Sequence, residues 1–193
     1  MDVAVFFLLA LNFLFLVSLP FVFFEKRDGR LNPMWWATAA PFVVCPGLVV
    51  ASELGLMPLF VSPDGGLGGG LTLFGVLLSA SSIALVAFTL GNHQAPLSQW
   101  HQENDAPREL VTHGAYSRIR HPFYAAYLLA FLAAVSIYPT AGTIGVLIYA
   151  AFILNHTAAR EEQRLRTSTF GIQYCDYRAR TGRFLPRMRR RPA

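Results

Sequence analysis

Charged residues are scarce in this sequence, making up only 14% of its 193 positions. A water-soluble domain of this size usually carries about a quarter. Hydrophobic residues reach 54%, which is too much apolar side chain for a disordered protein. Both observations favour an integral membrane protein. Since one span takes about 20 residues, five or six spans would leave room for a small polar appendage but for no separate soluble domain.

Cysteine is also scarce, and its placement excludes a disulfide framework. Cys45 lies within an apolar run, whereas Cys175 lies in the polar carboxyl-terminal region, so the two are not expected to pair. The five histidines do not show the spacing of metal ligands on one helix. We therefore predict neither a disulfide nor a metal site.

Five apolar runs predict the architecture, an all-α integral membrane protein with five transmembrane helices. The last two runs are short, so their helices need flanking residues to cross a bilayer core of about 30 Å. The first lacks the basic region and cleavage site of a signal peptide and is expected to be retained. A tight turn at Pro139 makes the last two a helical hairpin. The runs are 3–24, 34–60, 67–90, 123–138 and 141–155.

The basic residues divide the chain and predict its orientation. Of the 16 Lys and Arg, three lie between residues 26 and 30, three in the polar stretch 91–120, and ten after residue 155. None remains for the amino terminus or for the turns near residues 64 and 139. Lys and Arg accumulate in cytoplasmic loops, so we predict an inner-membrane protein of a bacterium, with its amino terminus outside and its carboxyl terminus in the cytoplasm.

Three smaller features have simple interpretations. The glycine-rich run 65–70 is expected to form a flexible turn rather than a phosphate cradle, since no strand precedes it. Glu53 lies near the outer end of its run, where a solvated or hydrogen-bonded carboxylate is favoured over a functional one. The basic tail 187–191 predicts contact with anionic lipid headgroups. Nucleic-acid binding is disfavoured, because no aromatic residues interleave with these charges.

Two segments that are expected to be cytoplasmic, residues 110–124 and 160–162, concentrate polar, aromatic and charged side chains. In segment 110–124, Pro122 suits a first helical position, and His121 and Tyr124 would share one helical face. Because the last two spans form a hairpin, His121 should lie near Glu162, which follows the fifth span. This arrangement predicts a polar pocket at the cytoplasmic interface. The residues alone leave an alternative open, in which these groups only mark a membrane edge and a solvated helix turn.

The order and spacing of the motifs point further. From Leu110 the chain reads Leu-Val-Thr-x-Gly-x-Tyr-x-x-x-Arg-His-Pro-x-Tyr, and from Glu161 it reads Glu-Glu-x-x-Leu-x-x-x-x-Phe-Gly-x-x-Tyr-x-x-Tyr. This pair of motifs resembles the isoprenylcysteine carboxyl methyltransferase family and its relatives, the membrane phospholipid N-methyltransferases. The resemblance covers roughly residues 90–186. It divides the chain into three amino-terminal helices, residues 1–90, and a methyltransferase core of loop, hairpin and tail, residues 91–193.

The resemblance implies a methyltransferase that uses S-adenosylmethionine without a Rossmann fold. The cofactor would be enclosed by the cytoplasmic loop, the ends of the last helices and the tail. Backbone groups at Leu110 and Val111 would contact the adenine, and His121 would contact the amino-acid moiety. Glu162 would bind the ammonium group or a ribose hydroxyl, and an aromatic face would lie near the sulfonium. The implied cofactor-binding residues are His101, Gln102, Arg108, Glu109, Leu110, Val111, Tyr116, His121, Pro122, Phe123, Tyr124 and Glu162.

One departure affects the methyl acceptor. The prenylcysteine branch has an acceptor-binding Arg four residues before the position of Glu162, where this chain has Ala158. Arg160 and Arg180 are the catalytic candidates in its place, with Arg183 a further possibility. The expected acceptor is lipophilic, most like a prenylated thiol acid that is methylated on its carboxylate. Phospholipid or small-amine N-methylation is the alternative of the same class.

Two other classes of function stay open at this point. A haem-bearing or NADPH-dependent membrane isomerase or reductase could use His113 or His121 as an axial ligand. A non-catalytic membrane scaffold would need no cofactor. The sequence does not determine the acceptor, the oligomeric state or the physiological role.

Overall fold

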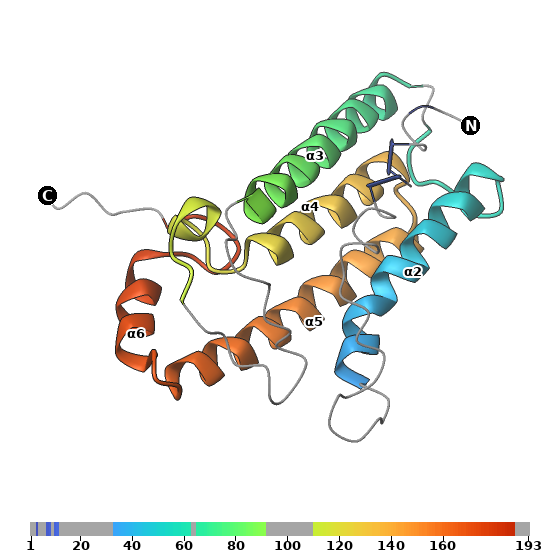
Figure 1. Ribbon diagram of the computed structural model, residues 1–193. Helices are drawn as coiled ribbons and strands as arrows, with labels where there is room; N and C mark the ends of the chain where they lie inside the picture. The colour runs from blue at the N-terminus through green and yellow to red at the C-terminus, as the bar shows by residue number, and fades with distance from the viewer. Residues whose placement is uncertain are drawn as a thin grey trace, which may run out of the picture.

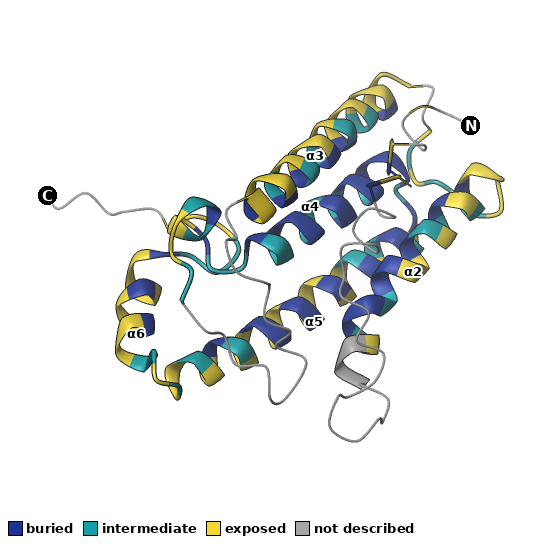
Figure 2. Cartoon of the chain, viewed as in Figure 1, coloured by how far each residue is buried: buried dark blue, intermediate teal, exposed yellow. Residues whose placement is uncertain are grey.

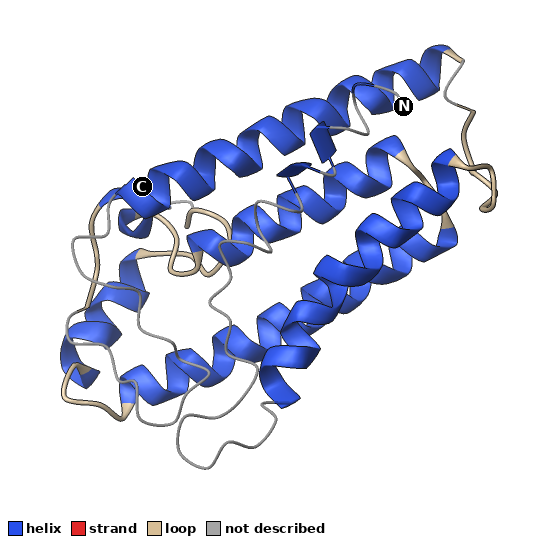
Figure 3. Cartoon of the chain, turned by 45° about the vertical axis from the view of Figure 1, so that its right-hand side comes forward, coloured by secondary structure: helices blue, strands red, loops and turns tan. Residues whose placement is uncertain are grey.

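The computed structural model describes residues 3, 7, 8, 10, 11, 33–62, 65–91 and 110–187. Within these residues it contains helices and one isolated parallel bridge, between Ile119 and Gly182, so the all-helical prediction is confirmed for the described part of the chain (Figure 3). The helices, in chain order, are α2 (Pro33–Glu53), α3 (Gly66–Gly91), the 3₁₀ helix η1 (Gly114–Ser117), α4 (Pro122–Ile137), α5 (Ala141–Arg166) and α6 (Gly171–Arg180).

Helix α4 lies at the centre of the bundle. It packs along α3 on one side and against α5 on the other, and α2 lies beside α5 (Figure 1). Figure 2 shows that most of α4 is buried, whereas α3 exposes its outer face. Buried alanines such as Ala126, Ala130 and Ala134 let the neighbouring helices approach closely. A helix that is apolar on nearly every side belongs in such a position.

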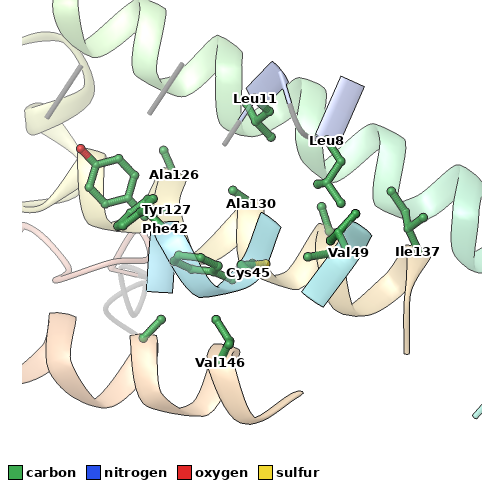
Figure 4. Packing of buried hydrophobic residues seen from close by; sticks show 14 of the residues in the cluster. Leu8, Leu11, Phe42, Cys45, Val49, Ala126, Tyr127, Ala130, Ile137 and Val146 are labelled. Carbon is green, nitrogen blue, oxygen red and sulfur yellow. The ribbon is translucent and has the colours of Figure 1, made fainter. Parts of the chain in front are cut away.

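Aromatic side chains join α2 to the central helix. The ring of Phe42 lies 4.9 Å from that of Tyr127 and 5.0 Å from that of Phe131. Leu8 and Leu11, from the amino-terminal region, are buried in the same hydrophobic cluster (Figure 4). The core of the bundle therefore combines residues from both halves of the chain. The division at residue 90 stays a prediction, and α3 and α4 pack together across it.

The outer faces of the bundle are apolar, as lipid contact requires. Leu73, Leu77 and Phe88 on α3 and Ile148 and Phe152 on α5 are all exposed. Water would disfavour so much exposed apolar surface.

In the part of the chain that the structure describes, three helices are long and apolar enough to cross a membrane: Trp36–Glu53, Gly66–Gly91 and Ala141–Arg166. Helix α4, with 16 residues, is shorter. These helices support an integral membrane protein. The count of five spans stays a prediction, since most of the first apolar run lies outside the described residues.

Helix α2 is shorter than the apolar run predicted. It ends at Glu53 rather than near residue 60 because Gly55 adopts a positive φ of 72°. The amide of Leu56 donates to the carbonyl of Ala51 at 2.9 Å, and the amide of Gly55 donates to the carbonyl of Ser52 at 3.0 Å. These two bonds make a Schellman motif, in which a left-handed glycine ends the helix.

Two other boundaries also differ from expectation. Helix α5 continues past residue 155 to Arg166, because its polar continuation consists mostly of strong helix formers such as Ala, Arg, Glu and Gln. The glycine-rich run is not a flexible turn from Gly66 onward, since it forms the first turns of α3. The amide of Gly69 donates to the carbonyl of Gly65 at 2.9 Å, which starts the hydrogen-bonding pattern of the helix.

The turns after α2 and after α4 meet at one end of the bundle, here called the turn end. The amide of Phe60 donates to the carbonyl of Pro139 at 2.8 Å, and the hydroxyl of Tyr138 donates to Glu53 at 2.8 Å. The expectation of a hydrogen-bonded Glu53 is confirmed. Thr140 caps α5, where its hydroxyl accepts from the amide of Thr143 at 3.1 Å. The two turns without basic residues therefore share an end, and which side of a membrane they face stays a prediction.

Candidate active site

The candidate residues lie at the opposite end of the bundle, here called the site end. Helix α4 begins there and α5 extends beyond it, while η1, α6 and the segment after α6 surround the space between them (Figure 1). Pro122 occupies the start of α4, where a proline loses no helical hydrogen bond. The predicted proximity of this helix start to the polar end of α5 is confirmed by contacts of both Arg120 and His121 with Glu162.

Backbone pairing fixes the carboxyl-terminal segment beside the start of α4. The amide of Arg120 donates to the carbonyl of Gly182 at 2.8 Å, and that of His121 donates to the carbonyl of Arg183 at 3.1 Å. The amide of Gly182 donates back to Arg118 at 3.1 Å. A Cβ atom at Gly182 would collide with the carbonyl of Leu185. Only glycine therefore lets the segment fold over this end.

Glu162 is the centre of a charged cluster. Its side chain is 5% exposed, and its carboxylate accepts from Arg120 Nε at 3.1 Å and from Arg183 Nε and Nη2 at 2.9 Å each. Arg178 Nε lies farther away, 3.9 Å from the same carboxylate. Three guanidinium groups thus converge on one buried carboxylate from three different segments. Burying these ion pairs costs desolvation free energy. Removal of one partner is nevertheless strongly destabilising, because it leaves a buried charge uncompensated.

Glu161 organises the aromatic side of the site. It accepts a hydrogen bond from the Tyr124 hydroxyl at 2.6 Å, and its other oxygen lies 3.4 Å from His121 Nδ1. The rings of His121 and Tyr124 are parallel, with centroids 5.4 Å apart. The shared helical face predicted for these two residues is therefore observed.

His121 is poised between both carboxylates. Its Nε2 lies 3.4 Å from Glu162 Oε1 but, within the described residues, forms no hydrogen bond. Burial lowers the pKa of His121, but the neighbouring carboxylates of Glu161 and Glu162 raise it by more, so the pKa lies above its ordinary value. The imidazolium form is favoured as a result.

Arg120 and Tyr177 connect the loop before α4 to α6. The Arg120 guanidinium also donates to the carbonyl of Thr181 and, at 3.4 Å, to that of Arg178. The Tyr177 hydroxyl donates to the carbonyl of Tyr116 at 2.7 Å. These bonds hold α6 over the site from outside the apolar bundle.

The structure brings together part of the predicted set. Tyr116, His121, Tyr124 and Glu162 lie at the site end, and Leu110 and Val111 lie half-buried at the start of the described loop. Four predicted cofactor contacts lie outside the described residues: His101, Gln102, Arg108 and Glu109. Within the described residues, Phe123 is partly buried against the core, and Pro122 is buried.

The two predicted catalytic arginines lie apart from the charged cluster. Arg160 is exposed on α5, and Arg180 is exposed on α6, where its Nε donates to the carbonyl of Asp176 at 3.3 Å. Ala158, at the position where the prenylcysteine branch has its arginine, is fully buried. The roles of Arg160 and Arg180 stay predictions.

Sequence reasoning gave no role to Arg120, Glu161 or Tyr174, and named Arg183 only as a further possibility. Arg120 and Glu161 stand inside the two motifs, so their position was a usable signal. Arg183 carried no such signal, because its place beside Glu162 depends on how the segment after α6 folds back. Tyr174 matched the second motif, but nothing in its spacing indicated that it would be buried.

A comparison with known protein families gives a match that covers the middle of the chain. The family model described as phospholipid methyltransferase matches residues 65–172, a little more than half of the chain. The match includes α3, the loop before α4, the α4–α5 hairpin and the start of α6. No curated protein and no solved structure matches the chain significantly.

Proposed function

Because the chain belongs to the phospholipid methyltransferase family, whose members are membrane methyltransferases acting on lipid-like substrates, we propose that it transfers a methyl group from S-adenosylmethionine to a lipophilic acceptor. The observation that carries this proposal is the buried Glu162 cluster. It joins the start of α4, the end of α5 and the segment after α6 at one end of an apolar bundle. A water-soluble cofactor and a lipid-soluble acceptor have to meet at such an interface.

The residues at the site end fit the chemistry of this cofactor. S-adenosylmethionine presents an ammonium, a carboxylate, a ribose diol and a sulfonium. The site offers two carboxylates, three guanidinium groups and a buried imidazole nitrogen that makes no hydrogen bond within the described residues. The cofactor supplies an activated methyl group on its sulfonium when it is bound.

The protein's own residues bind and orient. Glu162 would accept from the ammonium or a ribose hydroxyl, and His121 would donate from Nε2. An aromatic face of Tyr124 or of Tyr116 would lie near the sulfonium. Backbone groups at Leu110 and Val111 would contact the adenine. Holding donor and acceptor in line can supply several kcal/mol of the barrier reduction.

We extend the proposal to the remaining part of the loop. His101, Gln102, Arg108 and Glu109 precede the described segment and would complete the cofactor enclosure. In this proposal the cytoplasmic loop, the hairpin and the tail act together as one methyltransferase core, residues 91–193.

The acceptor is proposed to be a prenylated thiol acid, on the strength of the two motifs in their order. An ionised carboxylate needs no base for methylation. Arg160 and Arg180 would bind it at the rim of the site, where both are exposed.

Phospholipid or amine N-methylation remains the second candidate, favoured by the buried Ala158. An amine must lose a proton first, and Glu161, which already accepts from Tyr124, is placed to receive it.

Two measurements on detergent-purified protein test the proposal. Calorimetry should detect binding of S-adenosylmethionine, and a colourless preparation that binds S-adenosylhomocysteine would dismiss the haem class. Labelled cofactor is then supplied with a prenylcysteine analogue or with an ethanolamine phospholipid. Labelling of the analogue supports O-methylation, and labelling of the lipid instead would replace it by N-methylation. No binding in detergent or in lipid would reject the methyltransferase assignment.

A further inference from the structure

Two tyrosines on α6 differ in one respect. Tyr174 and Tyr177 are both buried, at 1% and 4% exposure. The Tyr177 hydroxyl donates to Tyr116, whereas the Tyr174 hydroxyl has no hydrogen-bond partner within the described residues. A buried hydroxyl without a partner is destabilising and uncommon. Such a group calls for a partner, and the described residues do not provide one.

The charged residues of the Glu162 cluster act electrostatically on this hydroxyl. Burial, followed by the nearby Glu162 carboxylate, raises the pKa of Tyr174 above its ordinary value, while Arg120, Arg178 and Arg183 act in the opposite direction. The phenol therefore stays protonated near neutral pH and is available as a donor. Arg178 follows Tyr174 by four positions, so both project from one face of α6.

Around Glu162, three arginines face one carboxylate, so positive charge is in excess there. Arg120 and Arg183 both donate directly to Glu162, whereas Arg178, which is 46% exposed, forms only a longer ion pair with the same carboxylate, at 3.9 Å. A guanidinium and a protonated phenol on one helical face are suited to a carboxylate or a phosphate. The excess charge would attract such an anion to the site.

We propose that Tyr174 and Arg178 form a subsite for a second anionic group, a carboxylate or a phosphate, beside Glu162. The subsite rests on the proposed function for its natural occupant. That occupant is the carboxylate of the cofactor or the anionic group of the acceptor, since both have the chemistry that the two side chains recognise. Tyr174 thereby becomes a binding residue rather than a part of the core.

The first test does not depend on the cofactor. Inorganic phosphate, compared with chloride at equal ionic strength, should raise the melting temperature of the free wild-type protein. The increase should shrink for both Tyr174→Phe and Arg178→Gln.

Tyr177→Phe is the matched control. It should lower the melting temperature without phosphate, because it loses a hydrogen bond. It should keep the increase that phosphate causes. Tyr174→Phe without phosphate should be as stable as the wild type or more so. An adventitious ion only would give the same response in all four proteins and would overturn the subsite.

The second test identifies the occupant. If the cofactor carboxylate occupies the subsite, Tyr174→Phe should weaken S-adenosylmethionine binding about tenfold and leave binding of the decarboxylated cofactor unchanged. If the acceptor occupies it, cofactor affinity stays constant and the acceptor KM rises about tenfold. Unchanged affinity and unchanged KM would overturn the proposal. Failure of the wild type itself to bind the cofactor would instead reject the proposed function and leave the phosphate test to decide the subsite.

Discussion

The α4–α5 hairpin has two ends that are built from different chemistry. At the turn end the donors are neutral hydroxyls: that of Thr143 donates to the carbonyl of Tyr138 at 2.6 Å, and that of Tyr138 donates to Glu53 of α2 at 2.8 Å. At the site end, Glu162 is held by Arg120 and Arg183, 42 and 21 residues away in the chain.

The two ends also differ in how completely their polar groups are satisfied. Of the three buried polar side-chain atoms without a hydrogen bond in the described residues, two belong to His121 and Tyr174 at the site end, and none belongs to the hydroxyls of the turn end. At the turn end, the buried hydroxyl groups all have hydrogen-bond partners within the described residues. The two atoms left without a partner at the site end are consistent with the ligand site proposed above.

Removal of the central carboxylate should have the largest effect. Glu162→Ala leaves the guanidinium groups of Arg120, Arg178 and Arg183 close together without a counter-charge, and should destabilise the protein by about 3 kcal/mol. Denaturant unfolding in detergent measures this change. Glu162→Gln is the matched variant, because it keeps the size and loses the charge. Equal stability of all three proteins would show that the cluster is not buried as described.

A steric change near the turn end should come next. A Cβ atom at Gly75 would lie 3.0 Å from the backbone oxygen of Ala133 and still closer to Ile137, so Gly75→Ala should cost about 1–3 kcal/mol. Gly145→Ala is the control, since nothing lies within 4 Å of its Cβ position. The loss should appear in unfolding and leave cofactor affinity nearly unchanged. A loss of affinity equal to that of Glu162→Gln would erase the distinction between the two ends.

The cap of α5 should matter less. Thr140→Ala removes both side-chain bonds with Thr143 and should reduce the free energy of unfolding by about 1 kcal/mol. Thr140→Ser keeps the hydroxyl and should recover most of that loss. If Thr140→Ala were as stable as the wild type, the capping box would contribute nothing to the turn end.

The smallest effect concerns pH. Since the pKa of folded His121 is raised above 6.5, its protonated form stabilises the fold. This contribution is fully present below the unfolded pKa and is lost as the pH rises through the folded pKa. The melting temperature should therefore fall as the pH rises above 6.5 and through the folded pKa, and His121→Gln should flatten that part of the profile. A wild-type profile that rises instead would contradict the contacts with Glu161 and Glu162.

Much of the bundle was predictable because apolar runs and turn residues act locally. The bounds of α3 and α4 fall within one or two residues of the runs 67–90 and 123–138. The hairpin at Pro139 followed from its sequence. The ends of α2 and α5 were less predictable, because an apolar run gives the membrane-compatible length, whereas the helix stops or continues according to Gly55 and to the helix formers after residue 155.

The candidate site was predictable only in part. The proximity of His121 and Glu162 followed from the hairpin alone, since the two helices are antiparallel. The role of Arg183 did not, because it depends on a backbone pairing between segments more than sixty residues apart. Arg160 and Arg180 are both exposed, and their roles at the acceptor stay predictions.

Binding of S-adenosylmethionine to purified protein, wild type against Glu162→Gln, tests the central claim most directly. The site end is predicted to bind the cofactor, and loss of the charge that meets its ammonium or ribose should weaken binding at least about tenfold. Thr140→Ala, altered at the turn end, should bind as the wild type does. A wild type that binds no cofactor in detergent or lipid bilayers, or a Glu162→Gln variant that binds it equally well, would contradict the account.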